Sequence, residues 1–232
     1  IMPFFRFFRN SVVRASLDKN MTHLCDAPIH DYYFEENQRR LLNEILGSDF
    51  RIGVGDNERK DLIESCAVKS EIDCPDLTSA IKNLRGDSYF EILSDFFQVL
   101  KNTRYDHSNA RLVGFKDLWV PEFLPVIARA FPNAKFMIVL RDIRAVAGSL
   151  VKLRQTKPEL NAHLMSYVRQ WRKLVACIVK YKRDRELVNR VHIVRYEDFV
   201  SDPLIELTKT CKFLGIEAVD SMLGKNGFLD PA

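Results

Sequence analysis

Arg141 and Ser149 have side-chain types and a spacing that suit the binding of a phosphate group. Arg141 directly follows the apolar run from Phe136 to Leu140, and Ser149 comes eight residues later in a segment with helical periodicity. Because this spacing is about two turns of an α-helix, the guanidinium at the strand end and the serine hydroxyl can converge on one anion. Alternatively, Arg141 pairs with the neighbouring Asp142, and Ser149 is an ordinary helix residue. The first interpretation predicts half of a nucleotide-phosphate site.

A parallel sheet would position this arginine, because short apolar segments alternate with helical ones along the chain. Strands that alternate with helices favour the α/β class, with a parallel β-sheet flanked by helices. Ligands of such folds bind beyond the carboxyl ends of the strands. The strands are expected at residues 1–8, 111–116, 135–140 and 190–195. The residues expected at their carboxyl ends are those after Phe8, then Lys116, Arg141 and the pair Arg195–Tyr196.

Helical periodicity covers much of the remaining sequence. Helices are expected at residues 11–17, 35–46, 89–100, 121–130, 143–153, 164–178 and 203–214. Residues 51–85 are polar and mixed, and they predict short helices at most. We expect a single domain over residues 1–232, in which a variable helical insertion covers about residues 48–110.

Composition and charge narrow the classes of function. Apolar residues make up 47% of the chain and charged residues 28%, which is enough to build a globular core. The formal net charge of +4 favours anionic ligands and is too small to indicate a nucleic-acid partner. No apolar stretch approaches the roughly 20 residues of a membrane-spanning helix. We therefore expect a globular protein with an anionic ligand and no membrane segment within this sequence.

The cysteines give no metal signature. No CxxC pair occurs among the five of them, and no His/Cys cluster has the spacing of a zinc site. Cys66 and Cys74 are close enough in sequence to form a disulfide in an oxidising compartment, while two free thiols are an equal alternative. The sequence therefore predicts a protein without a bound metal.

Three segments of the sequence occur in the same order as three segments of a known protein family. They are Val113–Lys116, which ends in a lysine, Phe131–Ser149, which contains Arg141, and Val191–Pro203, which contains Tyr196-Glu-Asp. Together they resemble the lysine-bearing strand, the 3′-phosphate-binding segment and the later strand of the sulfotransferase family. Members of that family use 3′-phosphoadenosine 5′-phosphosulfate (PAPS) as the sulfuryl donor.

The resemblance implies a fold and several site residues. The fold would be the α/β sulfotransferase fold, which is similar to that of P-loop NTPases. Arg141 and Ser149 would bind the 3′-phosphate of the donor. Tyr196 would lie near the nucleotide or shape its pocket, and the alternative is a core tyrosine that packs against a turn.

The start of the chain departs from this family at the phosphosulfate loop. Sulfotransferases carry a glycine there, which lets backbone N–H groups approach a phosphate at the start of a helix. Here Phe7–Asp18 occupies that place, and its loop part has no glycine. Arg9, Asn10 and Ser11 can supply a cation, an amide and a hydroxyl, which makes them candidate donor ligands. The alternative is a degenerate loop in a protein that no longer binds the donor well.

Sulfuryl transfer also needs a base that removes the proton of the acceptor. Some family members use an acidic residue after the first helix, and Asp26 and His30 lie in that part of the chain. Asp26 is the first candidate and His30 the second, against the alternative that both are loop residues. Lys116 is a candidate for steadying the sulfuryl group, or else a plain strand-end lysine. Asp117 and Glu122 are further candidates for the base.

The resemblance implies a PAPS-dependent enzyme that acts on a hydroxyl or amine of a carbohydrate, protein or small-molecule acceptor. Two other functions stay open at this point. One is a nucleotide-binding or interaction protein of the same fold with impaired catalysis, and the other is a P-loop nucleotide kinase. The kinase would need a Walker loop ending in Gly-Lys-Ser/Thr, which the sequence lacks. The oligomeric state stays open, and the location would be cytoplasmic, or Golgi-lumenal if an anchor precedes Ile1.

Overall fold

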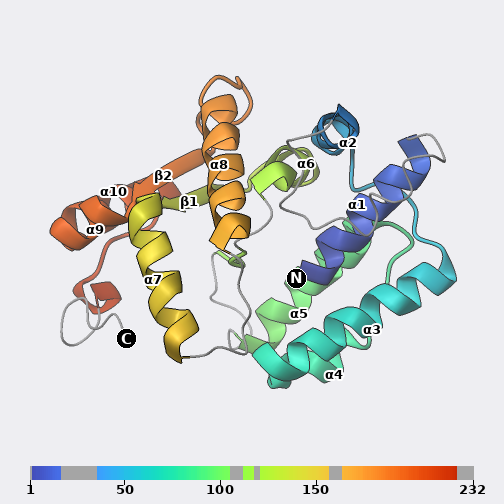
Figure 1. Cartoon of the computed structure of the whole chain (residues 1–232). Coiled ribbons are helices and arrows are strands. Elements are labelled where there is room, and N and C mark those ends of the chain that lie inside the picture. The colour runs from blue at the N-terminus through green and yellow to red at the C-terminus, as the bar shows by residue number, and fades with distance from the viewer. Residues whose placement is uncertain (1, 17–35, 105–111, 118–120, 157–163, 224–232) are drawn as a thin grey trace. The chain divides into compact units, whose positions relative to one another are not determined.

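The chain folds into two compact units, which are described one at a time (Figure 1). The structure is a computed structural model that describes residues 2–16, 36–104, 112–117, 121–156 and 164–223. The first unit spans Ile1–Pro132 and the second spans Asn133–Ala232. Whether they form one domain, as the sequence predicts, stays a prediction.

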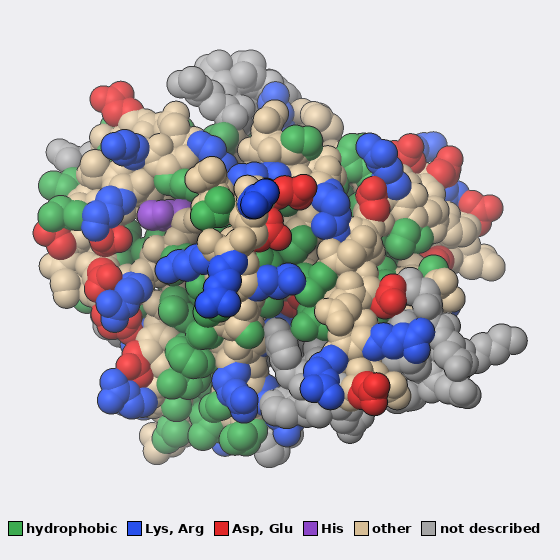
Figure 2. All heavy atoms as spheres, turned by 90° about the horizontal axis from the view of Figure 1, so that it is seen from above, with side chains coloured by type: hydrophobic (Ala, Val, Ile, Leu, Met, Phe, Trp, Pro, Cys, Tyr) green, Lys and Arg blue, Asp and Glu red, His purple; other side chains and the backbone are tan. Residues whose placement is uncertain are grey.

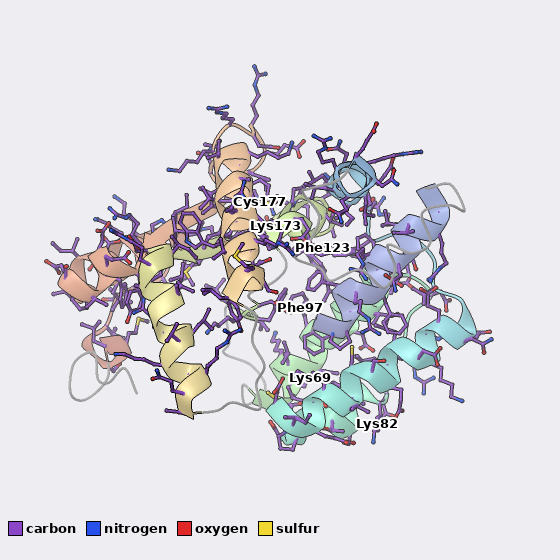
Figure 3. All side chains as sticks on the ribbon, in the orientation of Figure 1. Lys69, Lys82, Phe97, Phe123, Lys173 and Cys177 are labelled. Carbon is purple, nitrogen blue, oxygen red and sulfur yellow. The ribbon has the colours of Figure 1, made fainter. Side chains whose placement is uncertain are left out.

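The described part of the first unit is helical. Its longer helices are α1 (Met2–Ser16), α2 (Glu36–Gly47), α3 (Asp56–Asp73), α5 (Tyr89–Arg104) and α6 (Leu124–Ala130). Short turns of helix complete it, namely η2 (Pro75–Leu77), α4 (Thr78–Ile81) and η3 (Pro121–Phe123). Phe4, Phe5 and Phe8 of α1 are buried in an aromatic core. Phe123, labelled in Figure 3, packs on Phe5 with ring centroids 4.9 Å apart.

The strand expected at residues 1–8 was a wrong prediction, because the described part of this segment, residues 2–8, belongs to helix α1. The buried side chains of α1 include Phe4, Phe5, Phe8, Val12 and Val13. These positions are separated by one, three or four residues, so they form a continuous apolar stripe along one face of the helix. The eight-residue apolar run alone fits either a strand or a buried helix, and the helical stripe becomes visible only when residues 12 and 13 are included.

Two further expectations about the first unit were also wrong. Residues 51–85 contain the 18-residue helix α3 and not merely short helices. Residues 112–117 have no regular secondary structure, so the described part of the segment 111–116 forms no strand. Lys116 consequently does not sit at the end of a described strand. Helices α2, α5 and α6 confirm the expected helices at those places within a few residues.

The second unit contains the parallel pair that the sequence predicts. Strand β1 (Phe136–Leu140) pairs in parallel with β2 (Val191–Arg195), and the register runs from Phe136 opposite Val191 to Leu140 opposite Arg195. Helices α7 (Ile143–Thr156) and α9 (Tyr196–Ser201) begin where these two strands end. The unit also contains α8 (Leu164–Tyr181), α10 (Pro203–Leu214) and the short η5 (Asp220–Leu223).

The ends of α10 follow the signals in the sequence. The Asp202 carboxylate accepts a hydrogen bond from the backbone N–H of Ile205, and Pro203 occupies the first turn. Gly215 ends the helix with a φ of 78°, a left-handed conformation that glycine adopts without a steric penalty. This unit therefore has the local character of an α/β fold, with two parallel strands among its described residues.

The register has one direct consequence for the predicted site. Because the parallel strands β1 and β2 end opposite one another, the chain leaves both at the same edge. The residues that follow are Arg141 and Asp142 after β1, and Tyr196 and Glu197 after β2. Of the helices described, none has the length and apolar character needed to cross a membrane.

Candidate anion site at the ends of two parallel strands

The Arg141 side chain is held between an aromatic ring and a hydroxyl. Its Cζ lies 4.4 Å from the centroid of the Tyr196 ring, a cation–π contact across the two strand ends. Its Nη1 donates to Ser149 Oγ at 3.5 Å, the long limit of a hydrogen bond. Its Nε is buried and has no hydrogen-bond partner among the described residues. Donors left unpaired in this way suit an anionic ligand that accepts from the guanidinium.

Asp142 pairs with Arg144, which removes the alternative of an Arg141–Asp142 ion pair. Arg144 Nη2 lies 2.7 Å from Asp142 Oδ2, and the Arg144 backbone N–H donates to Oδ1 at 2.7 Å. The second of these contacts makes Asp142 the N-cap of α7. The hydrogen bond from the Arg144 side chain is the main reason that the pKa of Asp142 falls to about 2. The charge of Arg141 is therefore not neutralised by its acidic neighbour.

The peptide unit that joins Arg141 to Asp142 is held at both ends by side chains. Its carbonyl oxygen accepts from the indole N–H of Trp171 in α8 at 2.8 Å. Its N–H donates to Glu197 Oε1 in α9 at 2.8 Å. This N–H is the main reason that the pKa of Glu197 lies below its ordinary value. The site thus has two members, Trp171 and Glu197, that the sequence alone did not bring out.

A signal for one of these two residues was present in the sequence. Glu197 follows Arg195 by two residues, as Asp142 follows Leu140, and the parallel register pairs Leu140 with Arg195. A pairing of the two predicted strands in register would have placed Glu197 near Asp142. Trp171 belongs to the apolar stripe of the amphipathic helix α8, where nothing in the pattern separates a hydrogen-bonding tryptophan from a core residue.

The three residues proposed for the phosphosulfate loop lie in the first unit, inside helix α1. Arg9 is buried, and its Nε donates to Asn10 Oδ1 at 3.1 Å. The Ser11 hydroxyl donates to Glu58 Oε1 at 2.6 Å and lies 2.9 Å from the Tyr89 hydroxyl. The expected loop at the start of a helix is therefore wrong. Any role of these residues in donor binding stays a prediction.

Ser11 belongs to a polar network that joins α1 to α3 and α5. The same Glu58 oxygen also accepts from the Tyr89 hydroxyl at 2.9 Å and from Arg14 Nη2. Burial raises the pKa of Tyr89, so its hydroxyl stays protonated and can donate. The Ser11 hydroxyl is thus engaged in contacts that stabilise the helical unit.

The candidates for the chemical step are only partly described. Asp26 and His30 lie outside the described residues, and so does the turn expected around them. Lys116 is exposed and Asp117 is half-buried in the irregular stretch 112–117, while Glu122 is buried in η3. These three residues belong to the first unit and the Arg141 site belongs to the second.

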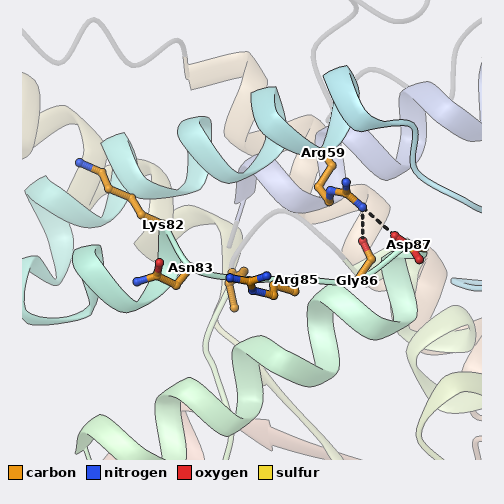
Figure 4. Close-up of a pocket in the computed structure, with 7 residues that line it drawn as sticks. Arg59, Lys82, Asn83, Arg85, Gly86 and Asp87 are labelled. Carbon is orange, nitrogen blue, oxygen red and sulfur yellow. Dashed lines mark hydrogen bonds and ion pairs between the residues drawn. The ribbon is translucent and has the colours of Figure 1, made fainter.

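A polar pocket in the first unit does not coincide with any predicted site residue. It has a volume of about 480 Å³ and lies between α3 and the turn before α5 (Figure 4). Arg59 in its wall pairs with Asp87 at 2.7 Å and with Asp56, while Lys82 pairs with Glu71 at 3.3 Å. Two of the three cations in its wall are thus paired with carboxylates, and the pocket contains none of the residues that the sequence proposes for donor binding.

Charged side chains are also exposed outside these two places. On the face seen in Figure 2, lysine and arginine side chains lie among acidic and apolar ones. In the second unit, the exposed residues Arg144, Lys152 and Arg154 form a basic run along α7.

Within the described ranges, no three or more His, Cys, Asp or Glu side chains are grouped as a metal site would require. The four cysteines described, Cys66, Cys74, Cys177 and Cys211, are free thiols.

Comparison with known proteins links the chain to enzymes of sulfate transfer. It is 31% identical over 117 residues to protein-tyrosine sulfotransferase 2 of Gallus gallus, which covers 49% of this chain and 31% of that protein. It is 28% identical over 109 residues to a putative protein-tyrosine sulfotransferase of Caenorhabditis elegans, which covers 47% of this chain and 41% of that protein. The chain thus matches less than half the length of either relative. No solved structure matches it.

The comparison that covers most of the chain is with a family as a whole. The model of the Sulfotransferase family matches residues 31–220, which include Arg141, Ser149, Trp171, Tyr196 and Glu197. The match begins after Arg9, Asn10, Ser11, Asp26 and His30. Because it extends over most of the sequence and contains the whole anion site, the chain belongs to the sulfotransferase family.

Proposed function

We propose that the protein transfers a sulfuryl group from PAPS to a hydroxyl or amine of an acceptor, and that Arg141 and Ser149 bind the 3′-phosphate of the donor. The observation that carries the proposal is the convergence of Arg141 Nη1 and Ser149 Oγ, 3.5 Å apart, beside a buried Nε that lacks a partner among the described residues. Family membership supports sulfate transfer as the reaction.

The geometry suits a phosphate for a simple electrostatic reason. A guanidinium offers several N–H donors in one plane, and a phosphate accepts two of them side by side. The Tyr196 ring covers one face of the Arg141 guanidinium, which leaves the edge of the group for hydrogen bonding. Ser149 lies in α7, eight residues after Arg141, and its hydroxyl would donate a further hydrogen bond to the same anion.

The acceptor class is proposed from the relatives. Both are named as protein-tyrosine sulfotransferases, so the phenol of a protein tyrosine is the first acceptor to test. Carbohydrate and small-molecule hydroxyls are the next. In the reaction the bond between sulfur and the donor's phosphate oxygen breaks, a bond from sulfur to the acceptor oxygen forms, and a base takes the acceptor proton. Asp26 and His30 are the proposed bases, and Lys116 is proposed to steady the sulfuryl group.

One observation favours a second candidate function, which is donor binding with impaired turnover. Residues 9–11 lie inside α1, where backbone N–H groups already serve the helix and are not presented to a phosphate. A protein with an intact 3′-phosphate site and no phosphosulfate loop would bind the nucleotide without efficient transfer. Measuring binding and turnover separately distinguishes the two functions.

The experiment is calorimetric titration with 3′-phosphoadenosine 5′-phosphate, followed by transfer from labelled PAPS to a tyrosine-bearing peptide. Arg141→Ala should weaken binding about 10- to 100-fold, because it removes charge-assisted hydrogen bonds. Arg154→Ala is the matched control, since that arginine is exposed in the last turn of α7. Absence of binding by the unmodified protein would refute the proposal. Binding without transfer to any tested acceptor class would favour the second candidate.

A further inference from the structure

The peptide unit between Arg141 and Asp142 is held in a way that ordinary secondary structure does not require. It lies past the last paired residue of β1 and before the first residue of α7. At such a junction water or backbone groups commonly satisfy the peptide. Here two side chains from two other helices do so, Trp171 through its indole N–H and Glu197 through its carboxylate, each at 2.8 Å.

These two contacts fix the orientation of the peptide plane. One acts on the carbonyl and the other on the N–H, so the plane cannot rotate without breaking at least one of them. The Cα of Arg141 belongs to that plane and carries the guanidinium. Anchoring the plane therefore also fixes this Cα, and a shift of the Cα would move the side chain away from the Tyr196 ring and from Ser149 Oγ, the two groups that now contact it.

We propose that Trp171 and Glu197 are positioning residues that hold the Arg141–Asp142 peptide so that Arg141 points at the 3′-phosphate. The inference rests on the proposed function and extends it to residues that need not touch the nucleotide. Their contribution is pre-organisation, because a guanidinium that is already oriented loses less entropy when the phosphate binds. The expected consequence is specific to ligands that carry a 3′-phosphate.

The test compares two ligands and two variants. Trp171→Phe keeps an aromatic ring and removes the N–H donor, and Glu197→Ala removes the acceptor at the other end of the same peptide. Each should weaken the binding of 3′-phosphoadenosine 5′-phosphate about 5- to 10-fold, which corresponds to the free energy of one hydrogen bond. Each should leave the binding of adenosine 5′-phosphate unchanged. The double variant should lose less than the product of the two single losses, because both contacts hold one group. Glu217→Ala, an exposed carboxylate of the same unit, is the control.

A second measurement does not depend on the ligand. Residue-resolved hydrogen exchange of the Asp142 amide should be slow in the unmodified protein and faster in Glu197→Ala. If exchange accelerates while the ratio of the two affinities is unchanged, the peptide is held for stability alone and the positioning role is overturned. Equal losses for both ligands overturn it as well. If the unmodified protein does not prefer the 3′-phosphorylated ligand, the proposed function fails and the inference with it, whatever the exchange rates are.

Discussion

The Arg141 guanidinium lies over the Tyr196 ring, with its Cζ 4.4 Å from the ring centroid. The two residues are 55 positions apart in sequence and follow strands that pair in parallel. The contact therefore joins the segment that resembles a 3′-phosphate site to the segment with the Tyr196-Glu-Asp turn. It shows that the two resemblances noted in the sequence meet at one place in the second unit.

The stacking contact predicts a graded response to substitution at position 196. Tyr196→Phe keeps the ring and should bind 3′-phosphoadenosine 5′-phosphate as the unmodified protein does. Tyr196→Leu removes the ring face and should weaken binding about 2- to 5-fold, the value of a partly exposed cation–π contact. Calorimetric titration of both variants measures the difference. A loss in Tyr196→Phe as large as in Tyr196→Leu would show that the hydroxyl acts on the ligand directly.

The acidic groups around the held peptide predict a pH dependence of stability. The pKa of Asp142 falls from its ordinary 3.8 to about 2, and that of Glu197 lies below its ordinary 4.5. Because both are lowered in the folded state, their stabilisation is fully present above the ordinary values and is lost as the pH falls through the folded ones. The free energy of unfolding can be measured by chemical denaturation between pH 2 and 5, for the unmodified protein and for the double variant Asp142→Asn/Glu197→Gln. It should depend less steeply on pH in the variant. Parallel slopes would contradict the assignment.

The polar network in the first unit predicts a stability effect for Ser11. Its hydroxyl is buried between Glu58 and Tyr89, so Ser11→Ala leaves part of that network without a partner. We expect a loss of about 1–2 kcal/mol in the free energy of unfolding. Ser201→Ala, an exposed serine of α9, is the control and should change little. A stability unchanged by Ser11→Ala, together with weakened donor binding, would support the loop role that the sequence suggests.

The sequence was most informative where local and long-range signals agree. The strands at 136–140 and 191–195 coincide with short apolar runs between helical segments, and Asp202, Pro203 and Gly215 mark both ends of α10 unambiguously. Arg141 and Ser149 follow from the first of these strands by counting along one helix. The two hydrogen bonds to the Arg141–Asp142 peptide could not be found this way. They come from Trp171 and Glu197, which lie near this peptide only because of the packing of α8 and the register of β2.

The start of the chain shows the opposite case. The run before Arg9 is apolar at nearly every position, so it carries no strand alternation and fits either state. The alternation of short apolar segments with helical ones along the chain favoured the strand. In the structure the choice is decided by tertiary contacts, because Phe4, Phe5 and Phe8 on one helical face meet Phe50 and Tyr89. Local sequence could not supply those partners.

Substitutions along α1 test this correction directly. In a strand, Phe5 and Phe7 would point to the same side, whereas in the helix Phe5 is fully buried and Phe7 is only half-buried. Phe5→Ala should therefore cost about 3–5 kcal/mol in the free energy of unfolding, the range for emptying a buried aromatic site. Phe7→Ala should cost clearly less. Urea unfolding followed by circular dichroism measures both, and Phe8→Ala, which removes another fully buried ring, should resemble Phe5→Ala. Equal losses at positions 5 and 7, with a smaller loss at 8, would be the pattern of a strand and would overturn the helix.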